Sequence, residues 1–330
     1  DNTGWRMRVP EYPMLTAIGG NIPRQPSDWY DPECAPSRKG SWRLTPAHST
    51  QGFYSDANIR HLVNFAAARD IRIVPEISIP SHAGAAIRAY PHLGNPALVN
   101  EAPHGVNQTL WPSAASLNFV EAAFHHACSL FPSPTIHIGG ATTDWAPWES
   151  DSSLIRAGLT SGAAIERLFI DRALRTLHFH GRRAAAWDSL TKAYPTPPPG
   201  TTLLAHRPGN AGRRAAESSG APWVLADADI LTLSHPGRTN SPLEPAHTLF
   251  NNLTHRLRGE RLKGVEAVAW SSTVTTPDIL FYHLLPRLLV IAEAAWHGED
   301  SLPWDKLAPL VEQEMAHLRR SVPYWNPQRP

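Results

Sequence analysis

The residues of this sequence best suited to acid–base chemistry follow the run His137-Ile138-Gly139-Gly140. Asp144 and Glu149 lie shortly beyond it, in a predicted loop. A carboxylic acid can protonate a leaving oxygen if it comes within about 2.6–3.2 Å of that oxygen, directly or through one water. Directly after the two glycines stand Ala141 and Thr142, whose side chains cannot serve as proton donors at neutral pH. The two loop acids are therefore the nearby candidates for proton transfer, and solvated loop acids are the simpler interpretation.

The histidines and cysteines do not have the spacing of a metal or redox site. The runs His125-His126 and His178-Phe179-His180 lie in predicted helical or helix-end segments, without a third ligand at the spacing of a catalytic zinc site. Cys34 and Cys128 form no Cys-x-x-Cys motif, and they can pair only if their Cα atoms come within about 7 Å. We expect two thiols, no bound metal and no cofactor.

Composition and charge restrict the class of partner. Hydrophobic residues make up 42% of the chain and charged residues 18%, which is typical of a globular protein. The formal net charge is +1 and there is no basic stripe, so nucleic acid is not expected as the main partner. Charged residues and proline interrupt the apolar stretch 284–295, and a membrane span needs roughly 18 uninterrupted apolar residues. We expect no membrane span.

Short apolar runs alternate with helical patterns along the chain. The run 71–77 is rich in β-branched residues, as in a strand buried on both faces. Further strands are predicted at 135–138, 183–187, 201–205, 223–226 and 265–270. Helices are predicted from the cap at Ser55-Asp56 onward and over 117–130, 163–180, 278–296 and 304–318. Strands in such alternation pair in parallel through right-handed crossovers, which predicts an α/β fold but does not decide between an open sheet and a closed barrel.

Several sequence blocks occur in a fixed order along nearly the whole chain. The most specific is Phe131-Pro132-Ser133-Pro134 leading into His137-Ile138-Gly139-Gly140. Other blocks are Asp1-Asn2-Thr3-Gly4-Trp5-Arg6, Gly52-Phe53-Tyr54-Ser55, Pro75-Glu76-Ile77, Pro80-Ser81-His82-Ala83, Trp187-Asp188, Gly264-Val265-Glu266-Ala267 and Pro286-Arg287. In this order they resemble the catalytic domain of glycoside hydrolase family 20, the β-N-acetylhexosaminidases.

The resemblance implies an eight-stranded (β/α)8 TIM barrel, with its site at the carboxyl ends of the strands. Aligned in this way, residues 1–330 form a single hexosaminidase-like barrel domain. The domain comprises the loop after strand 2 and strands 3 to 8, and the first two strands are missing from this chain.

The resemblance also implies the chemistry. Family members remove a terminal N-acetylhexosamine by substrate-assisted catalysis, in which the sugar's acetamido oxygen attacks the anomeric carbon. A Glu protonates the departing oxygen, an adjacent Asp holds the acetamido nitrogen, and the pair directly follows the His-x-Gly-Gly run. Those positions are Ala141 and Thr142 here. Because general acid catalysis typically contributes about 10² to 10⁴ in rate, we expect the family reaction to be lost or severely impaired.

The other substrate-binding positions implied by the resemblance are partly kept and partly replaced. Retained are His82, Trp187, Asp188 and Trp270. Five positions differ from the family pattern. Ser78 stands in place of an acidic residue and His206 in place of a pocket Trp. Thr232, Ser234 and Ser272 stand in place of a Tyr, an Asp and a Glu. An aromatic floor thus remains, while most polar contacts to the sugar are replaced.

Three functions remain open for this carbohydrate-related domain. It could be a hexosaminidase-family barrel without hydrolase activity that retains binding to an N-acetylhexosamine-containing glycan. It could be an active glycoside hydrolase that uses displaced acids, Asp144 or Glu149. It could also be a non-catalytic scaffold. Family members are commonly secreted, periplasmic or lysosomal, and the resemblance carries this expectation to the present chain.

Overall fold

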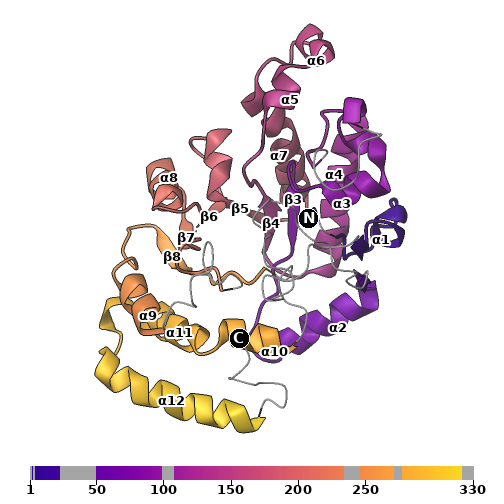
Figure 1. Cartoon of the computed structure of the whole chain (residues 1–330). Coiled ribbons are helices and arrows are strands. Elements are labelled where there is room, and N and C mark those ends of the chain that lie inside the picture. The colour runs from indigo at the N-terminus through magenta and orange to yellow at the C-terminus, as the bar shows by residue number, and fades with distance from the viewer. Residues whose placement is uncertain are drawn as a thin grey trace, which may run out of the picture. The chain divides into compact units, whose positions relative to one another are not determined.

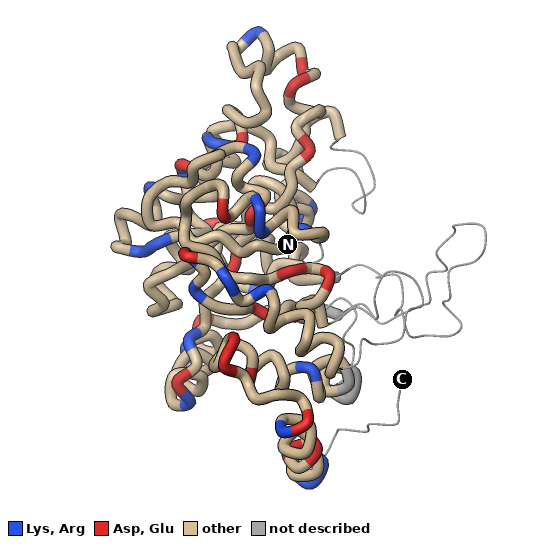
Figure 2. The backbone as a smooth tube through the Cα atoms, turned by 90° about the vertical axis from the view of Figure 1, so that its left-hand side faces the viewer, with Lys and Arg blue, Asp and Glu red and all other residues tan. Residues whose placement is uncertain are grey.

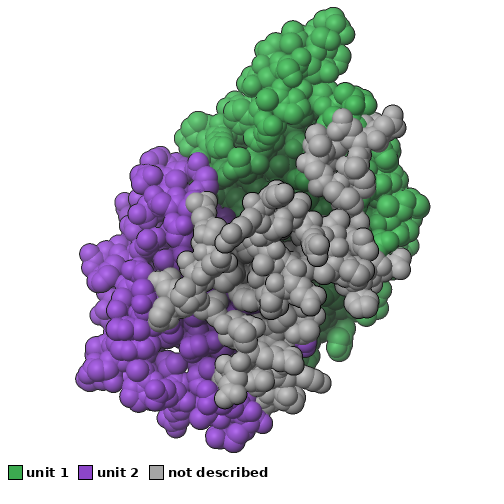
Figure 3. Space-filling model, in the orientation of Figure 1, with its two compact units in different colours: residues 1–23, 48–203 green, residues 24–47, 204–330 purple. Residues whose placement is uncertain are grey.

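The computed structural model of the chain describes residues 2, 4–22, 50–98, 108–233, 246–270 and 277–321. The chain divides into two compact units, one comprising residues 1–23 and 48–203 and the other residues 24–47 and 204–330 (Figure 3). The assignment of residues 1–330 to a single domain stays a prediction.

Parallel strands form the main sheet, and their order in the sheet is their order in the chain. The strands are β3 (Glu76–Ile79), β4 (Thr135–Gly139), β5 (Arg183–Trp187), β6 (Thr202–Ala205), β7 (Trp223–Leu225) and β8 (Leu262–Val265). β4 pairs in parallel with both β3 and β5, and β7 pairs in parallel with β8. This arrangement confirms the predicted α/β class with parallel strands.

Two predicted strands are displaced in the structure. The strand expected at 71–77 begins only at Glu76, and Ile71 and Val74 are exposed. Pro75, which precedes it, has no backbone N–H to donate to a ladder. The strand expected at 265–270 lies at Leu262–Val265 instead, because its partner β7 already ends at Leu225, opposite Val265.

In unit 1, helices begin at serine caps and pack on one another. α2 (Asp56–Ala67) begins after Ser55, whose side chain accepts from Asn58 N–H while Asn58 bonds back, a capping box. α4 (Ala114–Leu130) and α7 (Gly162–Phe179) also begin after serine caps, contact each other and lie next to β3, β4 and β5 (Figure 1). Shorter helices are α1 (Met14–Ala17), α3 (Gly84–Ala89), α5 (Ala146–Glu149) and α6 (Ser152–Arg156). β1 (Asn21–Ile22) and β2 (Thr50–Gln51) form a separate antiparallel pair.

The core of unit 1 lies between these helices and the strands. Its fully buried side chains include Phe119, Phe124, Ile136, Ile138, Ile165 and Phe169. Trp148 of α5 stacks on Phe169 of α7, with ring centroids 6.0 Å apart. The loop between β4 and α7 is therefore attached to the helix layer by packing as well as by hydrogen bonds.

Unit 2 contains the remaining helices: α8 (Ala211–Ser219), α9 (Ala246–Thr254), α10 (Pro277–Leu284), α11 (Arg287–His297) and α12 (Trp304–Ser321). The single helix predicted over 278–296 is in fact two, α10 and α11, which separate at Leu285-Pro286. Pro286 cannot donate the backbone hydrogen bond that a continuous helix needs there. α9 and α11 pack on each other, and Leu249, Leu253 and Ile291 of these helices are buried.

Basic and acidic residues are interspersed along the part of the chain that the structure describes (Figure 2). Among the described helices, none is long and apolar enough to cross a membrane. Cys128 is a free, buried thiol in α4, and Cys34 lies outside the described residues.

Candidate active site

The carboxyl ends of β3, β4 and β5 carry most of the predicted site residues of unit 1. In a parallel α/β sheet these ends meet at one edge, and ligands bind there. His82 follows β3, Ala141 and Thr142 follow β4, and Asp188 follows β5. The structure thus brings these segments to the same edge, as the resemblance implied.

The end of β4 turns through two glycines with left-handed backbone conformations. Gly139 has a φ of +79° and Gly140 a φ of +69°. A β carbon on Gly139 would lie 2.6 Å from the Ser78 Cα, so only glycine allows β4 to approach β3 so closely. Gly140 N donates to Ile79 O at 3.1 Å, which joins the two strand ends. This turn places the next two residues at the site.

Ala141 and Thr142, the positions expected to align with the family's Asp–Glu pair, are small and hydrogen-bonded residues. Thr142 Oγ1 lies 3.0 Å from Ser189 Oγ, which joins the loops after β4 and β5. The backbone oxygen of Ala141 accepts from Ser81 Oγ at 3.4 Å and from Thr143 Oγ1 at 3.3 Å. Neither position supplies a carboxylate, and the Thr142 hydroxyl has a partner.

The two loop acids each accept a backbone N–H at the start of a helix. Asp144 Oδ1 accepts from Ala146 N at 3.1 Å, at the first residue of α5. Glu149 Oε1 accepts from Gly162 N at 2.8 Å, at the first residue of α7. These N–H groups have no partner within their helices, so the carboxylates stabilise the helix starts.

A further carboxylate, Glu76, lies on the face of the sheet that carries Trp187 and His137. Trp187 Nε1 donates to Glu76 Oε1 at 2.9 Å, and Ser78 Oγ donates to the same oxygen at 3.0 Å. The buried His137 ring meets Trp187 edge-on, with centroids 5.0 Å apart. From the sequence, Glu76 was named only within the block Pro75-Glu76-Ile77 and was not predicted as a site residue. The signal that could have found it is a carboxylate inside the apolar run 71–79.

His137 is held as a neutral ring. Burial lowers its pKa, and the nearby carboxylate of Glu76, 3.4 Å from Nδ1, only partly opposes this effect. Gly139 N donates to Nδ1 at 3.2 Å, so Nδ1 carries the lone pair. In the described part of the chain, Nε2 has no hydrogen-bond partner. His137 therefore serves as a buried neutral contact for Trp187 and not as a charged group.

Two retained residues occupy specialised positions. His82 lies in the loop after β3, which ends at Ile79. It has a φ of +60° and is exposed. Asp188 is fully buried and begins the short 3-10 helix η4 (Asp188–Lys192). The roles that the resemblance implies for them, as for Trp187, stay predictions.

In unit 2, the described candidate residues are His206, Thr232 and Trp270. His206 Nδ1 lies 2.7 Å from Ala226 O, and its ring meets Trp270 edge-on at 6.0 Å. Thr232 forms an isolated parallel bridge with Val268. Ser234 and Ser272 lie outside the described residues.

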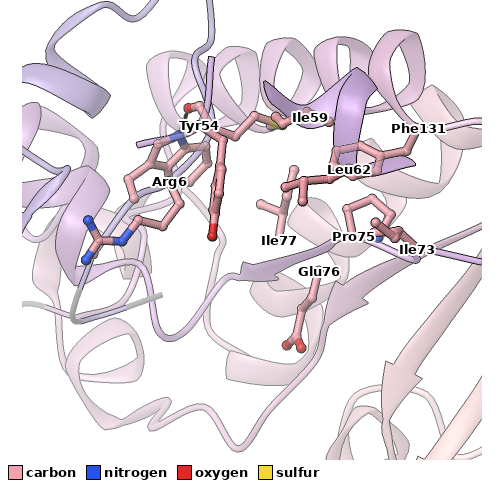
Figure 4. A pocket seen from close by; sticks show the side chains of 12 residues that line it. Arg6, Tyr54, Ile59, Leu62, Ile73, Pro75, Glu76, Ile77 and Phe131 are labelled. Carbon is pink, nitrogen blue, oxygen red and sulfur yellow. Dashed lines mark hydrogen bonds between the residues drawn. The ribbon is translucent and has the colours of Figure 1, made fainter. Parts of the chain in front are cut away.

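An apolar pocket of about 410 Å³ opens beside β3 (Figure 4). It is lined chiefly by Tyr54, Ile59, Leu62, Ile77 and Phe131. Glu76 belongs to its wall, but the carboxylate points away from Leu62 and Phe131 (Figure 4). Neither Trp187 nor the Ala141-Thr142 pair lines this pocket, and of the residues described at the candidate site it shares Glu76.

Metal binding was not expected for the histidines, and the described residues contain no group of three or more His, Cys, Asp or Glu that could hold a metal ion. One histidine of each run, His125 and His180, forms a pair in which His125 Nδ1 and His180 Nε2 lie 2.9 Å apart and share a hydrogen bond.

Comparison with known proteins identifies the family. Residues 1–299 match the catalytic domain of glycosyl hydrolase family 20. The chain belongs to this family. Among its relatives, the beta-hexosaminidase of Porphyromonas gingivalis is 25% identical over 349 residues, covering 98% of this chain and 40% of that protein. The Beta-N-acetylhexosaminidase of Cellulomonas fimi is 25% identical, covering 99% of this chain and 60% of that protein.

Solved structures of family 20 proteins support the fold. The GH20 exo beta-N-acetylglucosaminidase of Vibrio harveyi superposes with a TM-score of 0.80 at 24% identity, over 99% of this chain and 53% of that one. The GH20 beta-N-acetylhexosaminidase of Streptomyces coelicolor gives a TM-score of 0.76 at 22% identity, over 100% of this chain and 64% of that one. The predicted family and the TIM-barrel-type α/β fold are thereby confirmed. The chain spans about 40 to 60% of the two curated relatives described above.

Proposed function

We propose that this family 20 domain binds N-acetylhexosamine-containing glycans at the carboxyl ends of its strands and does not carry out the family's hydrolysis. The observation that carries the proposal is the end of β4, where Ala141 and Thr142 replace the acid pair. Thr142 Oγ1 is engaged with Ser189 Oγ at 3.0 Å. A threonine hydroxyl is far too weak an acid to protonate a leaving oxygen at neutral pH.

The loss affects two separate tasks of the reaction. Without a Glu at position 142 the departing oxygen is not protonated, which corresponds to about 10² to 10⁴ in rate. Without an Asp at position 141 the acetamido nitrogen is not held, so its oxygen is not oriented toward the anomeric carbon. The two losses need not multiply, because groups that act together contribute non-additively.

The competing function, hydrolysis through displaced acids, requires Asp144 or Glu149 to reach the leaving oxygen. Each of these carboxylates accepts a backbone N–H at the start of a helix, at 3.1 Å and 2.8 Å respectively. To donate a proton to a sugar, either carboxyl would have to be protonated, which weakens its bond to the N–H because a neutral acceptor is weaker than an ionised one. This cost supports a non-hydrolytic function.

The retained aromatic residue supports binding. Trp187 is the last residue of β5 and its indole N–H is bonded to Glu76, so the ring has a defined orientation. Only 7% of Trp187 is exposed, so the oriented ring would contact a pyranose ring through a small apolar part of its surface. Asp188, directly after it, adds a carboxylate at the same strand end.

A chromogenic N-acetyl-β-D-glucosaminide tests hydrolysis. We expect the wild-type chain to release no chromophore above the rate of a protein-free blank, whereas the Cellulomonas fimi relative assayed in parallel serves as the positive control. Turnover clearly above the blank that disappears in Asp144→Asn or Glu149→Gln would establish the competing function.

Isothermal titration with N-acetylglucosamine and chitobiose tests binding. We expect saturable heat for the wild type and none for Trp187→Ala. Trp296→Ala removes a tryptophan that is 85% exposed on α11 and is the matched control. An absence of heat for the wild type at millimolar sugar would instead indicate a scaffold.

A further inference from the structure

We propose that Glu76 is the positioning residue that fixes the ring of Trp187 for sugar contact. This inference rests on the glycan binding proposed above. It adds a residue that does not contact the sugar. Glu76 acts through the indole N–H of Trp187, to which its Oε1 is hydrogen-bonded at 2.9 Å.

The contact joins two strands that are not neighbours. Glu76 is the first residue of β3 and Trp187 the last residue of β5, with β4 between them. His137 of β4 lies between them in the sheet, because it is the residue paired with Glu76 in the strand register. The hydrogen bond therefore fixes the ring relative to the strand on the far side of β4.

The acceptor is itself held in place. Ser78 Oγ donates to the same Glu76 oxygen at 3.0 Å, from the next position on that face of β3. Hydrogen bonds to an ionised carboxylate are stronger than those between neutral groups. Glu76 Oε1 is thus a fixed acceptor and not the end of a freely rotating side chain.

The ring is constrained in two independent ways. The bond to Glu76 sets the direction of the indole N–H, and the edge-on contact with His137 at 5.0 Å sets the tilt of the ring. Trp187 is only 7% exposed, so water offers little competition for its N–H. Without the carboxylate, the ring keeps its hydrophobic packing but loses the interaction that selects one orientation.

Indole N–H resonances of ¹⁵N-tryptophan-labelled protein report this contact directly. The chain contains 12 tryptophans, and Trp187→Phe assigns the signal of interest. Glu76→Met keeps the length of the side chain without the acceptor, and Glu76→Gln keeps a carbonyl acceptor. We expect the Trp187 N–H resonance to move upfield and exchange faster with solvent in Glu76→Met, and to recover in large part in Glu76→Gln. Glu121→Gln, which changes an exposed ion pair between Glu121 of α4 and Arg172 of α7, is the matched control, and its Trp187 signal should be unchanged.

Sugar affinity is then measured by titration on the same variants. We expect chitobiose affinity to fall about tenfold in Glu76→Met, in line with the loss of a charge-assisted hydrogen bond, and to recover in part in Glu76→Gln, whose neutral carbonyl still accepts. An unshifted Trp187 resonance in folded Glu76→Met would overturn the proposal, and so would a shifted resonance with unchanged affinity. If the wild type binds no sugar, the proposed function fails and the ligand role of Glu76 fails with it, whereas the resonance still shows whether Glu76 holds Trp187.

Discussion

Gly139 lies so close to Ser78 that a β carbon on the glycine would be 2.6 Å from the Ser78 Cα. The contact is between backbones, so no side-chain rotation can relieve it. It lets the ends of β3 and β4 converge where Ala141 and Thr142 enter the site. The His-Ile-Gly-Gly run is thus a structural requirement of the strand ends, separate from the chemistry of the residues that follow it.

Gly139→Ala should destabilise the chain by more than the conformational cost alone. A non-glycine residue in the left-handed region costs roughly 1–2 kcal/mol, and here the backbone clash with β3 adds to it. Gly158→Ala is the matched control, because Gly158 has a φ of +80° and a methyl group there would have no atom within 4 Å. Urea unfolding measures both, and equal losses of unfolding free energy would contradict the importance of the contact.

Glu166 should make the chain less stable as the pH rises. Burial raises the pKa of this carboxyl, and hydrogen bonds from the Trp145 and Thr143 side chains only partly offset it. Because the folded-state pKa lies above the unfolded one, the stabilisation is complete below the unfolded pKa and is lost as pH rises through the folded pKa. We expect Glu166→Gln to flatten this decline in urea unfolding between pH 4 and 8, and Glu121→Gln to leave it in place. A pH dependence unchanged by Glu166→Gln would refute the assignment.

Cys128 should react slowly with iodoacetamide in the folded chain. Burial raises the pKa of this thiol to about 11, so only about one thiol in 10³ is ionised at pH 8, and the thiolate is the reactive form. The rate of alkylation at Cys128 can be measured by peptide mass spectrometry. We expect this rate to increase strongly in denaturing urea. Equal rates with and without urea would show that the thiol is accessible in the native state.

The loop acids should affect stability and not turnover. Glu149→Gln removes the negative charge at the first N–H of α7, and we expect a loss of about 0.3–1 kcal/mol in unfolding free energy. Asp144→Asn also removes a charge and, like Glu149→Gln, keeps an oxygen acceptor, but α5 has only four residues, so we expect a smaller loss there. Both variants should release chromophore at the rate of the protein-free blank. An unchanged unfolding free energy in Glu149→Gln would argue against a stabilising role for the bond between Glu149 and Gly162.

Much of the fold follows from local patterns in the chain. The strand predicted at 183–187 coincides with β5, because the short apolar run is flanked by polar residues on both sides and its limits are visible in the sequence. The errors occur at prolines and at strand partners. Pro75 delays the start of β3, Pro286 separates α10 from α11, and β8 stops where β7 ends. The sequence of one strand does not show where the neighbouring strand ends, although that neighbour determines how far the pairing extends.

The candidate site was only partly accessible to sequence reasoning. The position of Ala141 and Thr142 after β4 was predicted correctly, because the glycine run marks the end of that strand. Glu76 was missed because its contact with Trp187 joins residues 111 positions apart and depends on β4 lying between their strands. The hydrogen bonds of the loop acids were missed for a similar reason, since a carboxylate near a helix start resembles a solvated one in sequence.

The bonds of Asp144 and Glu149 to helix-start N–H groups also determine how hydrolysis could be regained by mutation. Recruiting either acid would weaken the start of α5 or α7, so any gain in chemistry would come with a loss in folding. Position 142 carries no such conflict, because Thr142 is exposed and its hydroxyl bonds to another hydroxyl. A population selected for glycosidase activity would therefore reach it through new acids at 141 and 142 before it could use the acids already present.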